Sequence, residues 1–321
     1  MRVAIWGAGK MGQVHGEIYE KMKAEIAYVV ERDPAKAQAF SERFSCRISD
    51  SFEKLSEQEI DAADICLPTN LHLEAIRTAA KKCRAIFCEK PICLNAEEYL
   101  QLKKIGDEGT CAIMVGQVLR FWNGYVKSKE LVEEGAVGIP RMVNCLRRQK
   151  MPDWSKGNWL MDPEKSGGLL MDLSIHDIDY LYWLFGKPQK VYSQVVRNER
   201  TTVHNIMMIS YKECCANVIG SWGMPEAFGD GELEASLEII GDQGMITYKG
   251  GDWLEVIQGN KKETIKLEHT DGYEEELRYF VRSVEEGRYP QRADLYSVEG
   301  TMDILWAAQE SSGKGQAVTI I

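Results

Sequence analysis

Residues 3–12, Val-Ala-Ile-Trp-Gly-Ala-Gly-Lys-Met-Gly, decide the fold of the first part of this chain. An apolar run leads into Gly7, Gly9 and Gly12 at the spacing G-x-G-x-x-G, and a helical pattern follows. In such a turn the first glycine makes the tight bend, the second lets a pyrophosphate approach the backbone, and the third lets the helix pack on the strand. The stretch predicts a dinucleotide site. A glycine turn in another kind of α/β protein is the alternative.

A second apolar run, residues 26–30, ends at Glu31. A carboxylate roughly 20 residues after the last glycine meets the adenosine ribose hydroxyls in dinucleotide-binding folds. Glu31 disfavours a 2′-phosphate, whereas the neighbouring Arg32 is able to pair with one. We therefore expect NAD as the cofactor, with NADP or dual use left open.

Strands and helices alternate along the first third of the chain. The expected strands are 26–30, a short one at 47–48, 63–67, 85–88 and 112–115, and the expected helices are 34–44, 71–82 and 95–105, with Asp33, Asn70 and Asn95 as caps. Apolar strands that alternate with helices predict a doubly wound parallel sheet covered on both faces. Ligands bind beyond the carboxyl ends of such strands, so the glycine turn, Glu31, residues 68–70 and residues 89–91 share one rim.

The pattern changes after Arg120. We expect helices at 125–134, 170–185, 273–285 and 295–311, and strands at 141–148, at seven short runs between 191 and 267, and at 317–320. Successive strands without intervening helices predict a large open, mainly antiparallel sheet. The 321 residues thus divide into two α/β domains, 1–120 for nucleotide binding and 121–321 for the substrate, and no Pro/Gly/Ser-rich linker separates them.

Composition excludes several other classes of protein. Lys and Arg number 39 against 49 Asp and Glu, which gives a net charge of −10, and no basic run stands out, so no nucleic-acid partner is expected. No apolar stretch reaches the ~20 residues of a membrane helix, and the chain runs directly into its first strand without a signal peptide. Nine cysteines, mostly in apolar runs, predict reduced thiols in the cytoplasm. Their spacing is not that of a zinc site, and no metal is expected.

Two stretches carry candidate catalytic groups. Asp172 and His176 are four residues apart and share a face if the segment is helical, and a carboxylate beside an imidazole suits a general base for an alcohol. Acidic residues placed for a helix dipole, with an incidental histidine, are the alternative. Lys90 follows a buried strand, and there it is either a donor to a substrate oxygen or a solvated surface lysine.

The chain resembles the glucose–fructose oxidoreductase/inositol dehydrogenase/MocA family in residues 1 to about 190. The motifs that carry the resemblance are Gly7–Gly12, Glu31–Pro34, Pro68–His72, Glu89–Lys90–Pro91, and Gly167–Gly168 with Asp172, His176 and Asp179. Ser174 stands where the family often has glycine, and Glu31 replaces the more usual aspartate. Residues 191–321 resemble the second domain of the family only in their abundance of strands.

The resemblance implies a Rossmann domain followed by an α/β domain whose open sheet builds a homodimer or homotetramer. It implies that Lys90 lies between nicotinamide and substrate and acts with Asp172 and His176. The dinucleotide-binding residues it implies are Gly7, Gly9, Lys10, Met11, Gly12, Glu31, Arg32, Pro68, Thr69, Asn70, His72, Glu89 and Lys90. The expected substrate-binding residues are Lys90, Arg120, Trp154, Asn158, Trp159, Asp172 and His176. The tryptophans either stack on a sugar ring or fill the domain interface, and Arg120 faces either the cofactor or a structural carboxylate.

The function expected from these residues is hydride transfer between a nicotinamide cofactor and a secondary alcohol or ketone of a sugar, sugar derivative or cyclic polyol. Three alternatives remain open at this point. They are a redox-neutral NAD-dependent glycoside hydrolase, a dihydrodiol dehydrogenase-like enzyme, and a non-catalytic regulator that senses dinucleotide. The retained Lys90, Asp172 and His176 argue against the regulator, because a sensor has no need of a proton relay.

Overall fold

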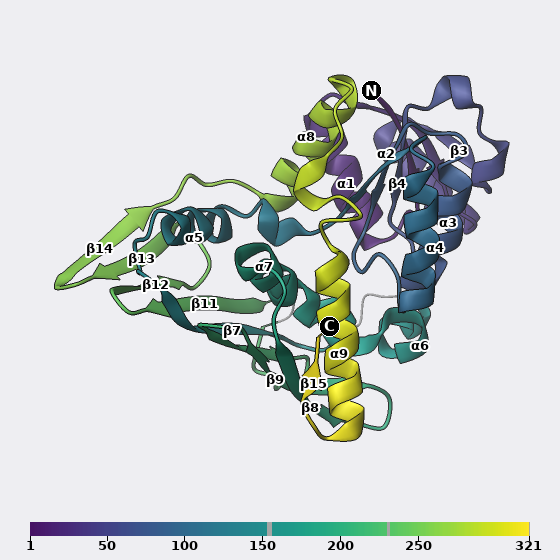
Figure 1. Cartoon of the computed structure of the whole chain (residues 1–321). Helices are drawn as coiled ribbons and strands as arrows, with labels where there is room; N and C mark the ends of the chain where they lie inside the picture. Colours follow the sequence, from purple (N-terminus) through teal and green to yellow (C-terminus); the bar gives the residue numbers. More distant parts are fainter. Residues whose placement is uncertain (153–155, 230–231, 321) are drawn as a thin grey trace. The chain divides into compact units, whose positions relative to one another are not determined.

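The protein is described here by a computed structural model that covers residues 1–152, 156–229 and 232–320, with the side chains of residues 156–158 left aside (Figure 1). The chain folds into two compact units. The first comprises Met1–Gln117, a short segment that ends at Trp159, and Tyr273–Val298. The second comprises Val118 to residue 152, Leu160–Gly272 and the chain from Glu299 onward. Each unit is described separately.

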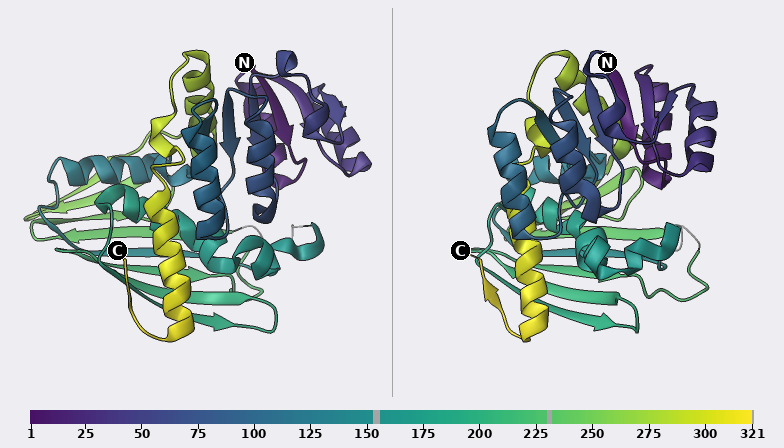
Figure 2. Two further views of the ribbon diagram at one scale, coloured as in Figure 1. Left: turned by 45° about the vertical axis from the view of Figure 1, so that its right-hand side comes forward. Right: turned by 90° about the vertical axis from the view of Figure 1, so that its right-hand side faces the viewer.

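The first unit is built on a six-stranded, fully parallel sheet in the order β3-β2-β1-β4-β5-β6. Its strands are β1 (Arg2–Trp6), β2 (Glu25–Val30), β3 (Arg47–Ser49), β4 (Ala62–Ile65), β5 (Ala85–Cys88) and β6 (Ala112–Val115). Its helices are α1 (Lys10–Lys21), α2 (Pro34–Phe44), α3 (His72–Ala79), α4 (Ala96–Asp107) and α8 (Gly272–Glu285), and they lie on both faces of the sheet (Figure 2). Every residue of β4 and β5 is buried, as expected for central parallel strands. The predicted doubly wound sheet is confirmed.

The compact units do not follow the single boundary expected at residue 120, because α8 belongs to the first unit. Phe280 of α8 packs edge-on against Phe87 of β5, with ring centroids 5.6 Å apart. Farther along, the Leu295 N–H donates to the carbonyl oxygen of Ile113 in β6 at 3.1 Å. Residues 273–298 therefore pack into the N-terminal unit through apolar contacts and hydrogen bonds at the edge of the sheet. About 150 residues of sequence lie between this segment and Gln117, where the first part of the unit ends.

The second unit contains a nine-stranded sheet in the order β14-β13-β12-β11-β7-β10-β9-β8-β15. Its strands are β7 (Pro140–Gln149), β8 (Lys190–Arg197), β9 (Thr202–Ser210), β10 (Cys215–Ser221), β11 (Leu233–Gly241), β12 (Gly244–Tyr248), β13 (Trp253–Gln258), β14 (Lys261–Lys266) and β15 (Val318–Thr319). Only the β7–β10 pair is parallel. The predicted open, mainly antiparallel sheet is therefore confirmed.

Helices cover one face of this sheet. They include α5 (Asn123–Glu133) and α7 (Ile175–Phe185), which lie above the sheet in Figure 1, and α9 (Glu299–Lys314), which lies beside β8 and β15. The short α6 (Pro163–Ser166) precedes α7. In β9, Val203, Asn205 and Met207 are buried, whereas the alternate residues Ile206 and Met208 are exposed. The pleat therefore points one set of β9 side chains at the core and leaves the other set uncovered.

Three local expectations need correction. Asn70 does not cap a helix, since Thr69–Leu71 forms a 3-10 turn and α3 begins only at His72 without a side-chain cap. The last long helix begins at Glu299 rather than at Leu295, because Leu295 pairs with the edge of the first sheet. The helix expected over 170–185 opens with a π-helical turn, Leu170–Ser174. Asp33 and Asn95 do cap α2 and α4, as predicted. Within the part of the chain that the structure describes, no helix is long and apolar enough to span a membrane.

Candidate active site

The glycine turn after β1 has the geometry of a phosphate cradle. Gly7 adopts φ +111°, and a Cβ there would lie 2.7 Å from the carbonyl oxygen of Cys66. A Cβ on Gly12 would lie 2.0 Å from the carbonyl oxygen of Gly7. By contrast, a Cβ on Gly9 would meet nothing within 4 Å. Gly7 and Gly12 are thus required by packing, whereas Gly9 faces the open space that a pyrophosphate requires.

The first turn of α1 completes this cradle. The N-cap is Gly9, which has no side chain to cap the helix, and no acidic residue lies in the first turn. The first helical hydrogen bond runs from the Gln13 N–H to the Gly9 carbonyl at 3.0 Å. The N-terminus of the helix therefore retains the N–H groups and the positive dipole end that attract a phosphate. These features fit a dinucleotide.

Glu31 lies beside the same turn. Its carboxylate accepts hydrogen bonds from the Ala8 N–H at 3.1 Å and from the Asp33 N–H at 2.9 Å. These bonds fix the carboxylate at the carboxyl end of β2, next to the glycine turn, while Arg32 is exposed. The arrangement fits the ribose-binding role of Glu31 predicted from the sequence. The Arg32 side chain does not pack into the core.

Two glycine substitutions should separate packing from cofactor binding. Gly9→Ala is expected to leave the melting temperature nearly unchanged and to weaken NAD binding by at least about 10-fold, because the new methyl group enters the phosphate space. Gly12→Ala is expected to destabilise the fold, because its methyl group meets the Gly7 carbonyl. Thermal unfolding and calorimetric titration with NAD check both. Equal loss of stability in the two variants would contradict the assignment.

The segment after β4 divides into exposed and buried positions. Asn70 is exposed, Pro68 is half-buried, and Thr69 is buried. His72 is fully buried, with Nδ1 2.9 Å from the Pro91 carbonyl oxygen and Nε2 2.8 Å from the Leu67 carbonyl oxygen. Both ring nitrogens are therefore engaged by backbone. We assign His72 to bracing this segment rather than to the direct cofactor contact expected from the sequence.

Glu89 and Lys90 follow β5 directly. The Glu89 side chain is buried, with 6% of the residue exposed, and its Oε2 accepts the Lys90 backbone N–H at 3.2 Å. Lys90 itself remains half-buried. This hydrogen bond restrains the backbone of residue 90, from which the Lys90 side chain extends. The Glu89 carboxylate therefore helps to set the position of the Lys90 side chain.

Asp172 and His176 are distinguished by exposure. Residues 168–181, all of which the structure describes, are buried except for these two side chains. Asp172 lies in the π-helical turn and His176 in the first turn of α7. Ser174, in the same turn, donates to the Asn205 side-chain oxygen of β9 at 2.7 Å, which fastens the turn to the sheet. Within residues 168–181, the two polar side chains that remain partly accessible are those predicted to be catalytic.

The neighbouring acidic residues of this helix have structural roles. The Asp179 carboxylate accepts hydrogen bonds from Nε of Arg120 at 2.8 Å and from one of its terminal nitrogens at 2.7 Å. Arg120 and Asp179 are each only 1% exposed. Asp177 forms the same kind of bidentate pair with Arg147 at 2.8 and 3.0 Å. The predicted substrate-binding role of Arg120 is therefore corrected, because its guanidinium is committed to a buried carboxylate 59 residues away.

The loop before α7 is described only in part. Trp154 lies outside the described residues, and the same holds for the side chain of Asn158. Trp159 lies in the 3-10 segment Lys156–Met161 and is half-buried. The expected roles of all three in substrate binding remain predictions.

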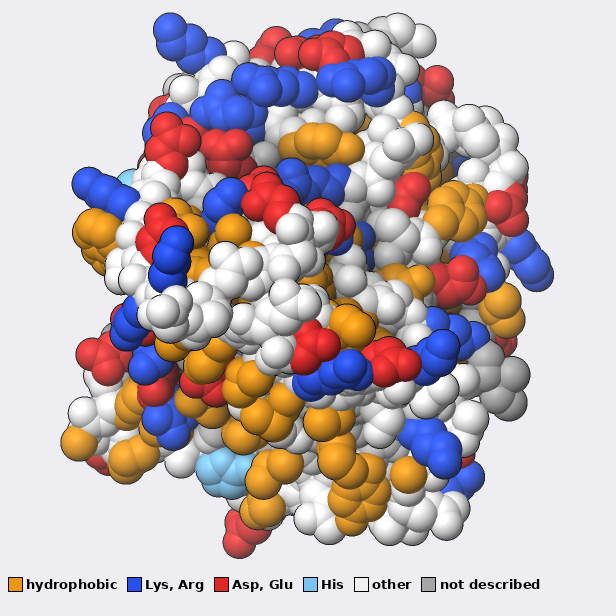
Figure 3. Space-filling view, turned by 60° about the vertical axis from the view of Figure 1, so that its left-hand side comes forward, with side chains coloured by type: hydrophobic (Ala, Val, Ile, Leu, Met, Phe, Trp, Pro, Cys, Tyr) orange, Lys and Arg blue, Asp and Glu red, His pale blue; other side chains and the backbone are white. Residues whose placement is uncertain are grey.

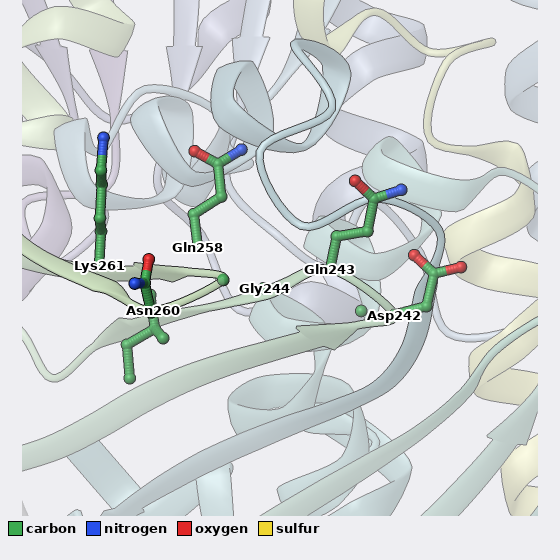
Figure 4. Close-up of a pocket in the computed structure, with 9 residues that line it drawn as sticks. Asp242, Gln243, Gly244, Gln258, Asn260 and Lys261 are labelled. Carbon is green, nitrogen blue, oxygen red and sulfur yellow. The ribbon is translucent and has the colours of Figure 1, made fainter.

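A polar hollow lies elsewhere in the second unit, at the turns that join β11 to β12 and β13 to β14 (Figure 4). It is lined by Gly241, Asp242, Gln243, Gly244, Ile257, Gln258, Gly259, Asn260 and Lys261. None of the predicted site residues lines it. It is a surface hollow between hairpin ends and contains no grouped acid, base or nucleophile.

Sequence reasoning missed one buried polar cluster in the first unit. His15 of α1 is fully buried and contacts Asp64 of β4 and Glu89. Asp64, which interrupts an otherwise apolar central strand, was the available sign, because a carboxylate in such a strand needs a buried partner.

The fold and the site define a two-domain, dinucleotide-binding oxidoreductase. Residues 1–117 match the family model "Oxidoreductase family, NAD-binding Rossmann fold", and residues 125–247 match the GFO/IDH/MocA C-terminal domain. The chain therefore belongs to the GFO/IDH/MocA family.

Named relatives and solved structures agree with this family. The myo-inositol 2-dehydrogenase of Thermotoga maritima is 25% identical over 100% of this chain and 98% of its own length. The inositol 2-dehydrogenase of Rhizobium meliloti is 30% identical, but the match covers only 58% of this chain and 56% of that protein. An oxidoreductase of Agrobacterium radiobacter, solved with NAD⁺, L-tartaric acid and magnesium, is 20% identical, with a TM-score of 0.88 over 100% of this chain and 98% of its own. This last similarity shows the shared fold.

Proposed function

We propose that the protein is an NAD-dependent dehydrogenase acting on a secondary alcohol of a sugar, sugar derivative or cyclic polyol. The observation that carries the proposal is the pair Asp172 and His176, the only accessible polar groups of an otherwise buried helix segment. Membership of an NAD-binding oxidoreductase family and similarity to proteins named inositol dehydrogenases support it.

The proposed chemistry assigns one task to each residue. A bound nicotinamide supplies the hydride acceptor. His176 accepts the proton of the substrate hydroxyl while the carbon–hydrogen bond breaks as a hydride, which leaves a ketone. Asp172 orients His176 or binds a further hydroxyl, and Lys90 donates to the oxygen as negative charge develops on it. In the reverse direction, His176 returns the proton.

The proposed cofactor residues are those that surround the glycine turn. The uncapped N-terminus of α1, with Lys10 and Met11, would hold the pyrophosphate, and Glu31 the ribose hydroxyls. NADP is the alternative because Arg32 is exposed beside Glu31. Pro68 and Asn70 follow β4 at the same edge of the sheet.

We assign residues 1–120 to nucleotide binding and residues 121–321 to substrate binding and oligomerisation. We also assign the protein to the cytoplasm.

The uncovered sheet face supports a homo-oligomer, a dimer or a tetramer. Its exposed apolar residues are Val196, Ile206, Met208, Ile219, Trp253 and Ile257. Figure 3 shows hydrophobic side chains gathered in the lower half of the face that it presents. Exposed apolar side chains gathered on one face are typical of an interaction site.

Ile206→Lys tests that assembly. Ile206 lies directly opposite Ile219 in the β9–β10 pair, and it is 61% exposed. A lysine there would bury a charge in the interface, so light scattering should report a monomer whose circular dichroism is unchanged. Gln38→Lys, at an exposed position of α2 in the first unit, is the control and should keep the assembly. A wild-type monomer would refute the interface.

The function is tested by a screen of cyclic polyols, aldoses, sugar phosphates and glycosides with NAD or NADP, read as reduced-nicotinamide absorbance. The proposal expects a substrate-dependent rise with at least one polyol or sugar. Release of an aglycone without net absorbance change would instead identify a redox-neutral hydrolase. A hit restricted to aromatic dihydrodiols would identify a dihydrodiol dehydrogenase. Tight dinucleotide binding without turnover of any compound would favour a sensor.

A further inference from the structure

A cluster of ionisable side chains is buried beneath the glycine turn of the first unit. His15 Nδ1 lies 2.9 and 3.1 Å from the two carboxylate oxygens of Asp64, and His15 Nε2 lies 3.2 Å from Glu89 Oε1. His15 and Asp64 are completely inaccessible, and the Glu89 side chain is nearly so. One imidazole therefore stands between two carboxylates that come from the ends of adjacent strands, β4 and β5.

The two carboxylates favour a protonated imidazole between them. Two buried carboxylates without a cation would each bear a large desolvation cost. Burial by itself lowers the pKa of His15, but the charges and hydrogen bonds of Asp64 and Cys66 together outweigh burial, and the pKa of His15 stands well above its ordinary value. The cationic ring forms a hydrogen bond with Asp64. Its Nε2 is close enough to Glu89 to form an ion pair, but the angle between the two groups does not allow a hydrogen bond.

The other groups that face the ring are neutral or apolar. Cys66 Sγ lies 3.3 Å from both His15 Nδ1 and Asp64 Oδ1, and burial raises the pKa of this thiol, so it stays protonated. The Phe87 ring meets the imidazole edge-on at 5.4 Å. Tyr19 of α1 is buried near Asp64, and Glu276 of α8 faces Tyr19. His15, Asp64 and Cys66 are close enough together to hold a metal ion, and binding one would require the ring and the thiol to lose their protons.

The cluster is connected to Lys90 through Glu89. One oxygen of Glu89 contacts the His15 ring, and the other accepts the Lys90 backbone N–H at 3.2 Å. A Cβ added to Gly116 would lie 3.4 Å from Glu89 Cα, Cδ and Oε1, so the Glu89 side chain lies alongside the backbone of Gly116. Any movement of the Glu89 carboxylate therefore moves the backbone from which the Lys90 side chain extends.

We propose that His15 is a positioning residue for Lys90, acting as an imidazolium that ties the Glu89 carboxylate to Asp64 and so fixes the start of the Lys90 side chain. This role rests on the proposed function, in which Lys90 donates to the reacting oxygen. A shift of about 1 Å in such a group lowers turnover by roughly 100-fold without removing any contact to the cofactor.

The first test is made on the free, unmodified protein. Nitrogen-15 NMR of labelled histidine should show both His15 nitrogens protonated at about pH 8, where an ordinary imidazole of pKa ~6.5 is neutral. The resonance is assigned by its absence in His15→Gln. Zinc chelation before measurement should leave the spectrum unchanged. A neutral ring at that pH, or a ring whose signals change on chelation, would overturn the proposal whether or not any activity has been found.

The second test is a double-mutant cycle on turnover. His15→Gln and Glu89→Gln should each lower kcat about 10-fold to 100-fold and leave the Kd for NAD within about threefold. The double variant should lose no more than either single variant, because both changes break one connection. Tyr28→Phe, which removes a partly buried hydroxyl that donates to Glu59 outside this cluster, should retain wild-type kcat. Additive losses, or a loss that falls on NAD affinity alone, would refute the positioning role while leaving the proposed dehydrogenase intact.

Discussion

Replacing His176 with alanine is expected to lower kcat by about 100-fold to 10,000-fold, the usual contribution of a general base, while the Kd for NAD stays within about twofold. The His176 side chain is half-buried, so its removal takes away a proton acceptor and little core contact. Steady-state kinetics on the substrate found by screening, with calorimetric titration of NAD, measures both quantities.

His269→Ala provides the matched control for this substitution. The His269 side chain is 89% exposed and pairs only at the surface with Asp252, at 2.9 Å. It should retain full turnover and affinity. Partial rescue of His176→Ala by added imidazole would support proton transfer as the missing step. If His176→Ala lost NAD affinity and turnover in equal measure, His176 would be a binding or structural residue and the assigned base would be wrong.

Lys90→Met is the second substitution with a large expected effect. Methionine keeps most of the unbranched side chain and removes the ammonium group, so the donor to the developing negative charge is lost while packing is preserved. The loss of one such donor lowers kcat by about 100-fold to 1,000-fold. The Glu89 hydrogen bond to the backbone of residue 90 does not depend on the side chain and should persist.

Comparison with Lys104→Met controls for the general loss of one positive charge. Lys104 lies in the last turn of α4, away from the strand ends, and its removal should change neither kcat nor NAD binding. Stopped-flow measurement of the hydride step should show the Lys90→Met defect directly. Wild-type hydride transfer in Lys90→Met would remove Lys90 from the reaction.

The parts of the fold that depend on neighbouring residues could be predicted from the sequence. The glycine turn at Gly7–Gly12 and the Asp33–Pro34 helix start are set by backbone geometry within a few residues, and both are found as expected. Alternation of apolar runs gave both sheets for the same reason, since periodicity reports which face of a strand is buried.

The parts that depend on distant partners could not be predicted. The role of Arg120 is set by Asp179, which is 59 residues away, and the partner of His15 is Asp64, which is 49 residues away. The π-helical turn at Leu170–Ser174 is fastened to the sheet by a hydrogen bond from Ser174 to Asn205, on a strand that follows later in the chain. The periodicity of a single sequence contains no information on such pairs. The candidate catalytic residues could therefore be predicted, but the distant residues that hold them in place could not.

The most direct test of the account is the fate of the hydrogen on the reacting carbon. The substrate identified by screening is prepared with deuterium at the oxidised carbon and incubated with the wild-type protein and NAD, and the nicotinamide product is analysed by mass spectrometry. The account predicts reduced nicotinamide carrying one deuterium per ketone formed, with formation nearly abolished in His176→Ala. Ketone or aglycone formed without deuterium in free reduced nicotinamide would contradict it.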